Sequence, residues 1–185
     1  MAACACPVGC SASDRKLRGE LSLTTPLVTG WIERWVRRPR AMRWSVPVFG
    51  MCLIWWSSSL AAGDEQPVVL GSLAHNCMHV VAYALLAASI WLAWSGCPAT
   101  ARQRLRSRAA WSLAACYGVV DELHQSFVPG RVCSIADVIS DCAGAALAVA
   151  LLRGALGLSS RWRRDALCCA LVAAVGVLSA TYAAG

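Results

Sequence analysis

A short segment from Asp121 to Asp141 concentrates groups that could bind a ligand or transfer a proton. It holds four carboxylates, a histidine, an amide and an arginine, namely Asp121, Glu122, His124, Gln125, Arg131, Asp137 and Asp141. Long apolar runs flank it on both sides. Charged side chains within membrane segments are costly and rare, so they are functional candidates by default. The segment is therefore the first place to look for a site, and the surrounding elements must position it.

The composition indicates an integral membrane protein. The chain has 185 residues, of which 58% are hydrophobic, and its mean hydropathy is +0.54. These values exceed those of ordinary soluble domains. The net charge of +7 is spread over short arginine clusters between apolar runs, so we expect no nucleic-acid partner.

The 11 cysteines show no paired CxxC arrangement with zinc-finger spacing. We expect most of them to behave as small buried apolar residues, and we expect no cofactor. A metal or redox role for the cluster Cys4, Cys6 and Cys10 is the alternative, but no histidine accompanies it.

Five apolar runs approach the roughly 20 residues that a membrane-crossing helix needs, at 44–62, 77–95, 109–127, 135–153 and 166–184. They predict an all-α integral membrane helical bundle with about five transmembrane helices, a four-helix core plus a C-terminal span. The third and fourth runs are less apolar because they carry the polar segment. The predicted division is a cytoplasmic tail ending in a basic interfacial helix (1–43, the helix at 31–43), a four-span domain (44–153), and a cytoplasmic loop with the last span (154–185).

The arginines predict the orientation of these spans. They cluster before the first span, between the second and third, and between the fourth and fifth, whereas the opposite side receives only Arg131. With five spans the three clusters share one side. The positive-inside rule then places the N-terminus and the loops 97–108 and 154–165 in the cytoplasm, and residues 63–76 and 127–134 outside.

Helical spacing groups the polar residues on the outer side. Asp121 shares a stripe with His124 and Gln125, and Glu122 is also one turn from Gln125. Asp137, Asp141 and Gly144 share a stripe on the fourth span that continues through Ala148, where small residues would let a neighbouring helix approach closely. On the second span, His79 and Tyr83 are one turn apart.

The dipeptide Pro129-Gly130 predicts a type II turn between the third and fourth spans. The turn would present Arg131 to the acids, and we expect Arg131 to pair with Asp137 or Glu122. Its guanidinium could instead bind a phosphate or carboxylate of a ligand.

The polar segment is also compatible with three roles besides ligand binding. It could be a buried network that only fixes helix packing. His75 and His79 have the one-turn spacing of a metal pair that Asp137 or Glu122 could complete, but no HExxH base lies between them, and we expect no metal. Asp121 and His124 could act as an acid–base pair, yet no serine elbow supplies a nucleophile. Ser57, Ser58 and Ser59 are expected to be packing hydroxyls.

The spacing of these residues resembles that of the VanZ-like family of small membrane proteins. The shared pattern is Glu-x2-Gln, then Pro-Gly-Arg, then an aspartate, a polar residue and a glycine, matched here by Glu122, Gln125, Pro129-Gly130-Arg131, Asp137, Asp141 and Gly144. The family's His-x3-Tyr matches His79 and Tyr83, and its serines match Ser57 to Ser59. The resemblance covers about residues 44–153.

The chain also departs from the pattern. The family often has Asp-Lys before the histidine, where this chain has His75-Asn76, and often Asn where it has Asp141. The resemblance implies kinship with factors that raise resistance to the lipoglycopeptide teicoplanin, and it implies no reaction.

The sequence thus predicts a VanZ-like protein of the bacterial inner membrane with a polar site that faces outward. We expect the site to bind a cell-envelope component, either a membrane lipid or a lipid-linked precursor with a phosphate-bearing headgroup. The alternatives are an intramembrane enzyme acting on an envelope lipid through Glu122, His79 and Asp137, and a structural or interaction protein. The expected ligand-binding residues are His79, Tyr83, Asp121, Glu122, Gln125, Arg131, Asp137 and Asp141.

Overall fold

The computed structural model describes residues 30–31, 34–60, 69–94, 100–131, 133–156 and 158–183. Five long helices make up most of this part, which contains no strand: α3 (Arg40–Ser58), α4 (Val69–Trp94), α5 (Thr100–Gln125), α6 (Ile135–Ala155) and α7 (Trp162–Ala183). The all-α fold class is therefore confirmed. The tail cysteines Cys4, Cys6 and Cys10 and the connection at 61–68 lie outside the described residues.

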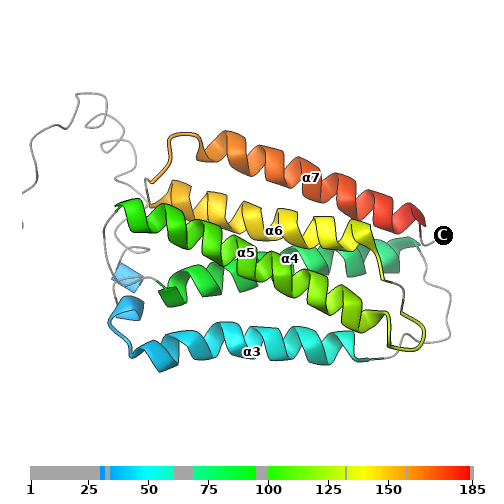
Figure 1. Ribbon diagram of the computed structural model, residues 1–185. Coiled ribbons are helices and arrows are strands. Elements are labelled where there is room, and N and C mark those ends of the chain that lie inside the picture. The colour runs from blue at the N-terminus through cyan, green and yellow to red at the C-terminus, as the bar shows by residue number, and fades with distance from the viewer. Residues whose placement is uncertain are drawn as a thin grey trace, which may run out of the picture.

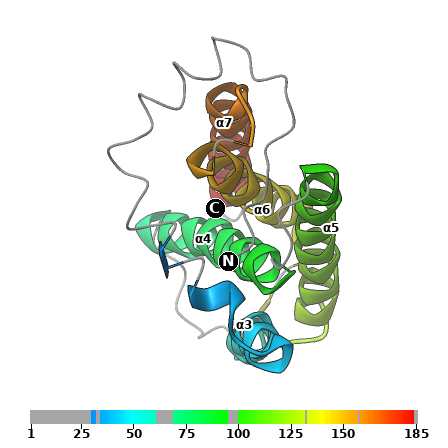
Figure 2. The same cartoon turned by 90° about the vertical axis from the view of Figure 1, so that its left-hand side faces the viewer.

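Helix α4 lies at the centre of the bundle. It contacts α3, α5, α6 and α7, while α3 also contacts α5, and α6 packs against both α5 and α7 (Figures 1 and 2). The apolar core joins α4, α5 and α6 through Tyr83, Ile90, Trp91, Ala114 and Val149. Because α4 is central, a polar side chain on it can meet partners from several helices at once.

Two local signals fix the connection between α5 and α6. The amide of Arg131 donates to the carbonyl of Val128 at 3.1 Å, and Gly130 has a φ of 76°, so the type II turn is confirmed. After it, Ser134 caps α6 by accepting a hydrogen bond from the amide of Asp137. Asp137 itself occupies the first turn, where a negative charge interacts favourably with the helix dipole.

The predicted basic helix at 31–43 is divided. Helix α3 begins at Arg40 after Pro39, whose fixed φ suits the start of a helix. Residues 34–36 form a separate helical segment, and Arg34 lies 4.4 Å from the ring centroid of Trp31. Residues 32–33 are outside the described part. The third span also starts earlier than the apolar pattern predicts, because α5 already includes residues 100–108, which were expected to form a loop.

The outside of the bundle is apolar and its inside carries polar groups. Phe49, Leu85, Leu123 and Val175 are largely exposed, whereas Asp121, Glu122 and Asp141 are buried. This distribution suits a lipid environment rather than water. Three helices of the described part are long and apolar enough to cross a membrane, at Leu73–Trp94, Ile135–Ala155 and Trp162–Tyr182. The chain is a helical membrane protein.

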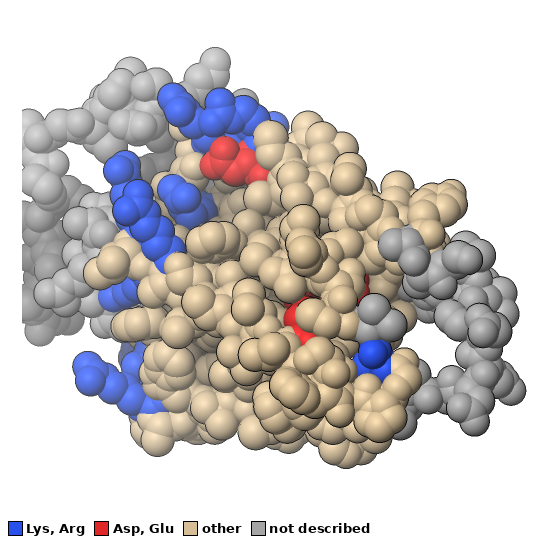
Figure 3. Space-filling view, turned by 45° about the vertical axis from the view of Figure 1, so that its right-hand side comes forward, with Lys and Arg blue, Asp and Glu red and all other residues tan. Residues whose placement is uncertain are grey.

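The basic side chains gather at one end of the bundle. Helices α3, α5 and α7 begin there, and α4 and α6 end there (Figure 1). This arginine end carries Arg40, Arg43, Arg104, Arg106, Arg108, Arg153, Arg161, Arg163 and Arg164, and Figure 3 shows the basic surface on its left-hand side. The end of α5, the turn at Gly130 and the start of α6 lie at the opposite end, which we call the site end.

Candidate functional site

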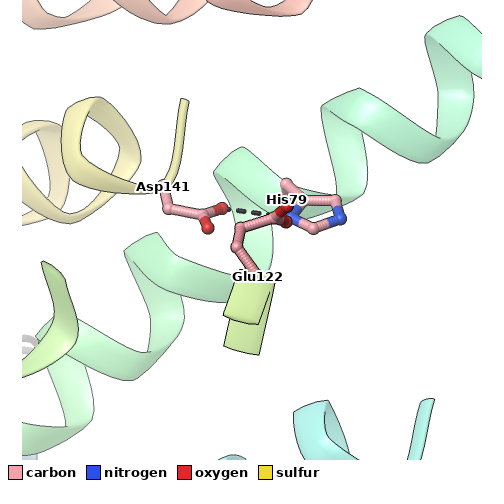
Figure 4. A group of neighbouring side chains, drawn as sticks. All are labelled: His79, Glu122 and Asp141. Carbon is pink, nitrogen blue, oxygen red and sulfur yellow. Dashed lines mark hydrogen bonds and ion pairs between the residues drawn. The ribbon is translucent and has the colours of Figure 1, made fainter. Parts of the chain in front are cut away.

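Three side chains from three helices converge near the site end: His79 of α4, Glu122 of α5 and Asp141 of α6 (Figure 4). The imidazole Nδ1 of His79 lies 3.1 Å from the carboxylate Oδ1 of Asp141. One possible ligand atom from each of the three residues lies within 4.8 Å of those of the other two. We call this group the His–Glu–Asp cluster. All three side chains are buried, with exposures of 9% for His79, 1% for Glu122 and 0% for Asp141.

Close helix packing brings Asp141 to this place. A Cβ atom on Gly118 would lie 3.1 Å from Asp141 Oδ2 and 3.3 Å from the Tyr83 ring, so glycine on α5 leaves room for both. A Cβ atom on Gly144 would collide with the backbone carbonyl of Val80, which confirms that the small stripe on α6 lets a neighbouring helix, α4, approach closely. The His79 and Tyr83 rings stack at 6.5 Å between centroids.

Two further hydrogen bonds hold the acids of α5. Glu122 Oε2 accepts from the backbone amide of Ser134 at 2.9 Å, which links α5 to the start of α6. Gln125 donates through Nε2 to Asp121 Oδ2 at 3.2 Å, as their shared stripe predicts. Buried oxygens of four acids nevertheless lack a hydrogen-bond partner within the described residues: Asp121 Oδ1, Glu122 Oε1, Asp137 Oδ1 and Asp141 Oδ2.

The predicted ion pair of Arg131 with Asp137 or Glu122 is wrong. The guanidinium points to the C-terminal end of α3, where Nε donates to the carbonyl of Leu60 at 3.2 Å and Nη2 to that of Ser57 at 3.3 Å. Its Nη1 lies 3.2 Å from Nε2 of His75. Carbonyls at a helix C-terminus lack intrahelical partners and carry partial negative charge, so they attract a cation. No described carboxylate neutralises Arg131.

A cavity of about 340 Å³ opens between α3, α4 and α5, with Arg131 at its wall. Five of the expected binding residues line it: His79, Tyr83, Asp121, Gln125 and Arg131. Glu122 and Asp141 lie beside the cavity rather than on its wall, and Asp141 is joined to it through His79. Asp137 is also absent from the wall, and its backbone amide is held by the Ser134 cap.

Ser57, Ser58 and His75 belong to the cavity wall, although the sequence alone assigns them other roles. The two serines were expected to be packing hydroxyls. Their match to the serines of the family pattern, at Ser57 to Ser59, is the feature of the sequence that could have predicted their place in the cavity wall. His75 lies beside Arg131, and its ring centroid is also 5.1 Å from that of His79. His124 is elsewhere: it stacks on Trp55 at 3.8 Å between centroids and lies 3.0 Å from Ser59 Oγ. It is therefore not placed as an acid–base partner of Asp121.

Fold and site together define a helical membrane protein with a buried polar site between its helices. The VanZ/LLP1 family model matches residues 22–158, well over half of the chain. The chain therefore belongs to the VanZ/LLP1 family, as its Glu122–Gly144 pattern predicts. The match extends beyond the expected 44–153. Neither a curated protein nor a solved structure matches the chain.

Proposed function

We propose that this protein is a VanZ-like protein of the bacterial inner membrane, whose cavity binds the anionic headgroup of a cell-envelope lipid or lipid-linked precursor. The observation that carries the proposal is Arg131 at the wall of the 340 Å³ cavity, oriented by α3 and paired with no described carboxylate. An arginine held in this way can offer its remaining donors to phosphate oxygens.

The size of the cavity supports a headgroup rather than a whole lipid. Ligand pockets usually measure about 300–1,000 Å³, so 340 Å³ suits a small polar group. Met78, which lines the cavity, is also 63% exposed on the apolar outside of α4. A headgroup in the cavity could therefore keep its acyl chains in the surrounding lipid. Gln125 and Tyr83 supply further polar groups that would orient it.

The orientation belongs to the same proposal. The arginine end faces the cytoplasm under the positive-inside rule, so the N-terminus is cytoplasmic and the cavity opens toward the outer leaflet. An envelope lipid or lipid-linked precursor in that leaflet could then reach the cavity. The alternative is an intramembrane enzyme. It has less support, because no lining serine donates a described hydrogen bond to a base that would activate it as a nucleophile.

Native mass spectrometry of the full chain, purified in mild detergent, tests the proposal. We expect anionic lipid or lipid-linked species to co-purify with the wild type and with Arg163→Ala, a matched control at the arginine end. Arg131→Ala should retain roughly tenfold less, because a hydrogen bond to a charged group contributes about 1.5–3 kcal/mol. Equal retention in both variants, or co-purification of neutral lipids alone, would refute the role of Arg131.

Family membership supports a link to teicoplanin tolerance, which we include in the proposal. The same two variants test it in a susceptible host. Expression of the wild type and of Arg163→Ala should raise the inhibitory concentration, whereas Arg131→Ala should not. No change with the wild type would remove this part of the proposal and leave the headgroup site standing.

A further inference from the structure

The His–Glu–Asp cluster has a composition that the proposed headgroup site does not explain. One imidazole and two carboxylates, each from a different helix, lie with possible ligand atoms within 4.8 Å of one another (Figure 4). Neither Glu122 nor Asp141 lines the cavity. A ligand in the cavity would therefore leave these two carboxylates without a role.

The charges of the cluster are not balanced by the described residues. His79 pairs with Asp141, but it can neutralise one carboxylate at most. Among the described residues, the hydrogen bond to Glu122 comes from the neutral amide of Ser134, and Arg131 points to α3. Buried charges are normally paired or coordinate metals. If both carboxyls are ionised, the cluster carries an excess of negative charge in a buried place, and a bound cation would neutralise it.

Two oxygens in the cluster lack a partner within the described residues and are buried. They are Glu122 Oε1 and Asp141 Oδ2, on side chains that are 1% and 0% exposed. In Figure 4 the carboxylates of both residues point toward the His79 ring. Unsatisfied oxygens of this kind are rare in folded proteins, since each would need a hydrogen bond or an ion.

From this juxtaposition we propose that His79, Glu122 and Asp141 bind one divalent cation of the Zn²⁺ or Mn²⁺ type. Nitrogen and carboxylate ligands suit such ions, and three protein ligands leave one position open on tetrahedral Zn²⁺ and three on octahedral Mn²⁺. Tetrahedral ligands about 2.1 Å from one ion lie about 3.4 Å apart, so ligand atoms at the 4.8 Å limit would have to approach by about 1.4 Å, shared between two side chains. The inference goes beyond the headgroup proposal and does not depend on it.

The position of His79 gives the ion a role at the cavity. His79 belongs both to the cluster and to the cavity wall, so an ion bound to it would lie close to an anionic headgroup. Arg131 and the ion would then approach a bound headgroup from two directions. The sequence alone suggests a different set, His75 with His79, and predicts no metal; the structure instead groups His79 with Glu122 and Asp141, and places His75 Nε2 3.2 Å from Arg131 Nη1.

Metal analysis of the purified full chain tests the inference. The protein is stripped of metal with EDTA, incubated separately with Zn²⁺, Mn²⁺ or Mg²⁺, and desalted. The retained metal per chain is then measured by inductively coupled plasma mass spectrometry. We expect about one Zn²⁺ or Mn²⁺ per chain in the wild type and in the control Asp165→Asn, which removes a partly exposed carboxylate beside Arg164. Glu122→Gln and Asp141→Asn should each bind at least about tenfold more weakly, since even residues that only orient metal ligands contribute that much.

A second measurement requires no variant. Adding the ion to stripped wild-type protein should raise its melting temperature, because the ion binds the folded state only. No retained ion and no thermal shift in the wild type would overturn the proposal and would indicate protonated carboxyls instead. Retention unchanged in both cluster variants, or binding of Mg²⁺ alone, would also overturn it.

The headgroup proposal and the ion proposal can be tested separately with Arg131→Ala. Arg131→Ala should keep the ion, because the hydrogen bonds of Arg131 go to α3 and His75 and to none of the three ligands. Loss of lipid with retention of metal in that variant would support both proposals.

Discussion

At the scale of single residues, the two carboxylate oxygens of Glu122 have different roles, and substitutions can separate them. One oxygen accepts the amide of Ser134 and so fixes the start of α6, while the other has no partner within the described residues. The first task needs only an acceptor, whereas the second needs a negative charge or an ion. A neutral amide therefore preserves one and removes the other.

We predict that Glu122→Gln, measured without metal, unfolds near the wild-type temperature, because its amide oxygen can still accept from Ser134. Glu122→Ala should lose about 1–3 kcal/mol, since the buried amide of Ser134 is left without its partner. Thermal unfolding followed by tryptophan fluorescence in detergent measures both. Equal and large destabilisation by the two variants would show that the charge itself maintains the fold, as the alternative of a purely structural network requires.

At the scale of the helices, the positions of the elements were predictable and their ends were not. The apolar runs at 77–95 and 109–127 correspond to α4 (Val69–Trp94) and α5 (Thr100–Gln125). Both helices begin earlier, because α5 continues through the basic residues at 100–108 and α4 through the mixed segment 69–76. The run at 135–153 matches α6 closely, since the Ser134 cap coincides with the start of its apolar residues.

The same distinction applies to the site. Contacts within one helix or one turn follow from spacing, as for Gln125 with Asp121 and for the turn at Gly130. Contacts between helices depend on their rotation and separation, which no local pattern specifies. The pairing of His79 with Asp141 and the contact of Arg131 with α3 are of this second kind.

Gly144 provides a test at the helix scale. We predict that Gly144→Ala destabilises the protein by about 1–3 kcal/mol, because the added methyl group would collide with the carbonyl of Val80 and push α4 away from α6. Gly50→Ala is the matched control, since its Cβ would meet only Leu86 Cδ1 at 3.8 Å. Thermal unfolding of the two variants measures the difference. If Gly50→Ala were as harmful as Gly144→Ala, the close α4–α6 approach would not be the cause.

At the scale of the whole molecule, the basic residues and the buried acids lie at opposite ends of the bundle. The arginine end holds nearly all described basic residues of the helices, and the site end holds the buried acids and Arg131. This asymmetry gives the proposed orientation its basis.

Labelling with a membrane-impermeant thiol reagent tests the orientation in cells. Ser126→Cys and Ser160→Cys are matched substitutions, both exposed, at the site end and the arginine end respectively. In a background without the native cysteines, we expect labelling of Ser126→Cys in intact cells and of Ser160→Cys only after lysis. The reverse pattern would turn the cavity toward the cytoplasm and contradict an envelope ligand from the outer leaflet.

The polarity of α5 has a consequence for how the protein is made. Helix α5 is absent from the three described helices that are apolar enough to cross a membrane, and its stripe of Asp121, Glu122 and Gln125 is buried against its neighbours. Isolated in lipid, that stripe would be exposed at a high cost. The neighbours that cover it, α4 and α6, directly precede and follow it in the chain. During synthesis α5 should therefore enter the bilayer as part of a group of helices, and its stable insertion should wait until the ribosome has delivered α6.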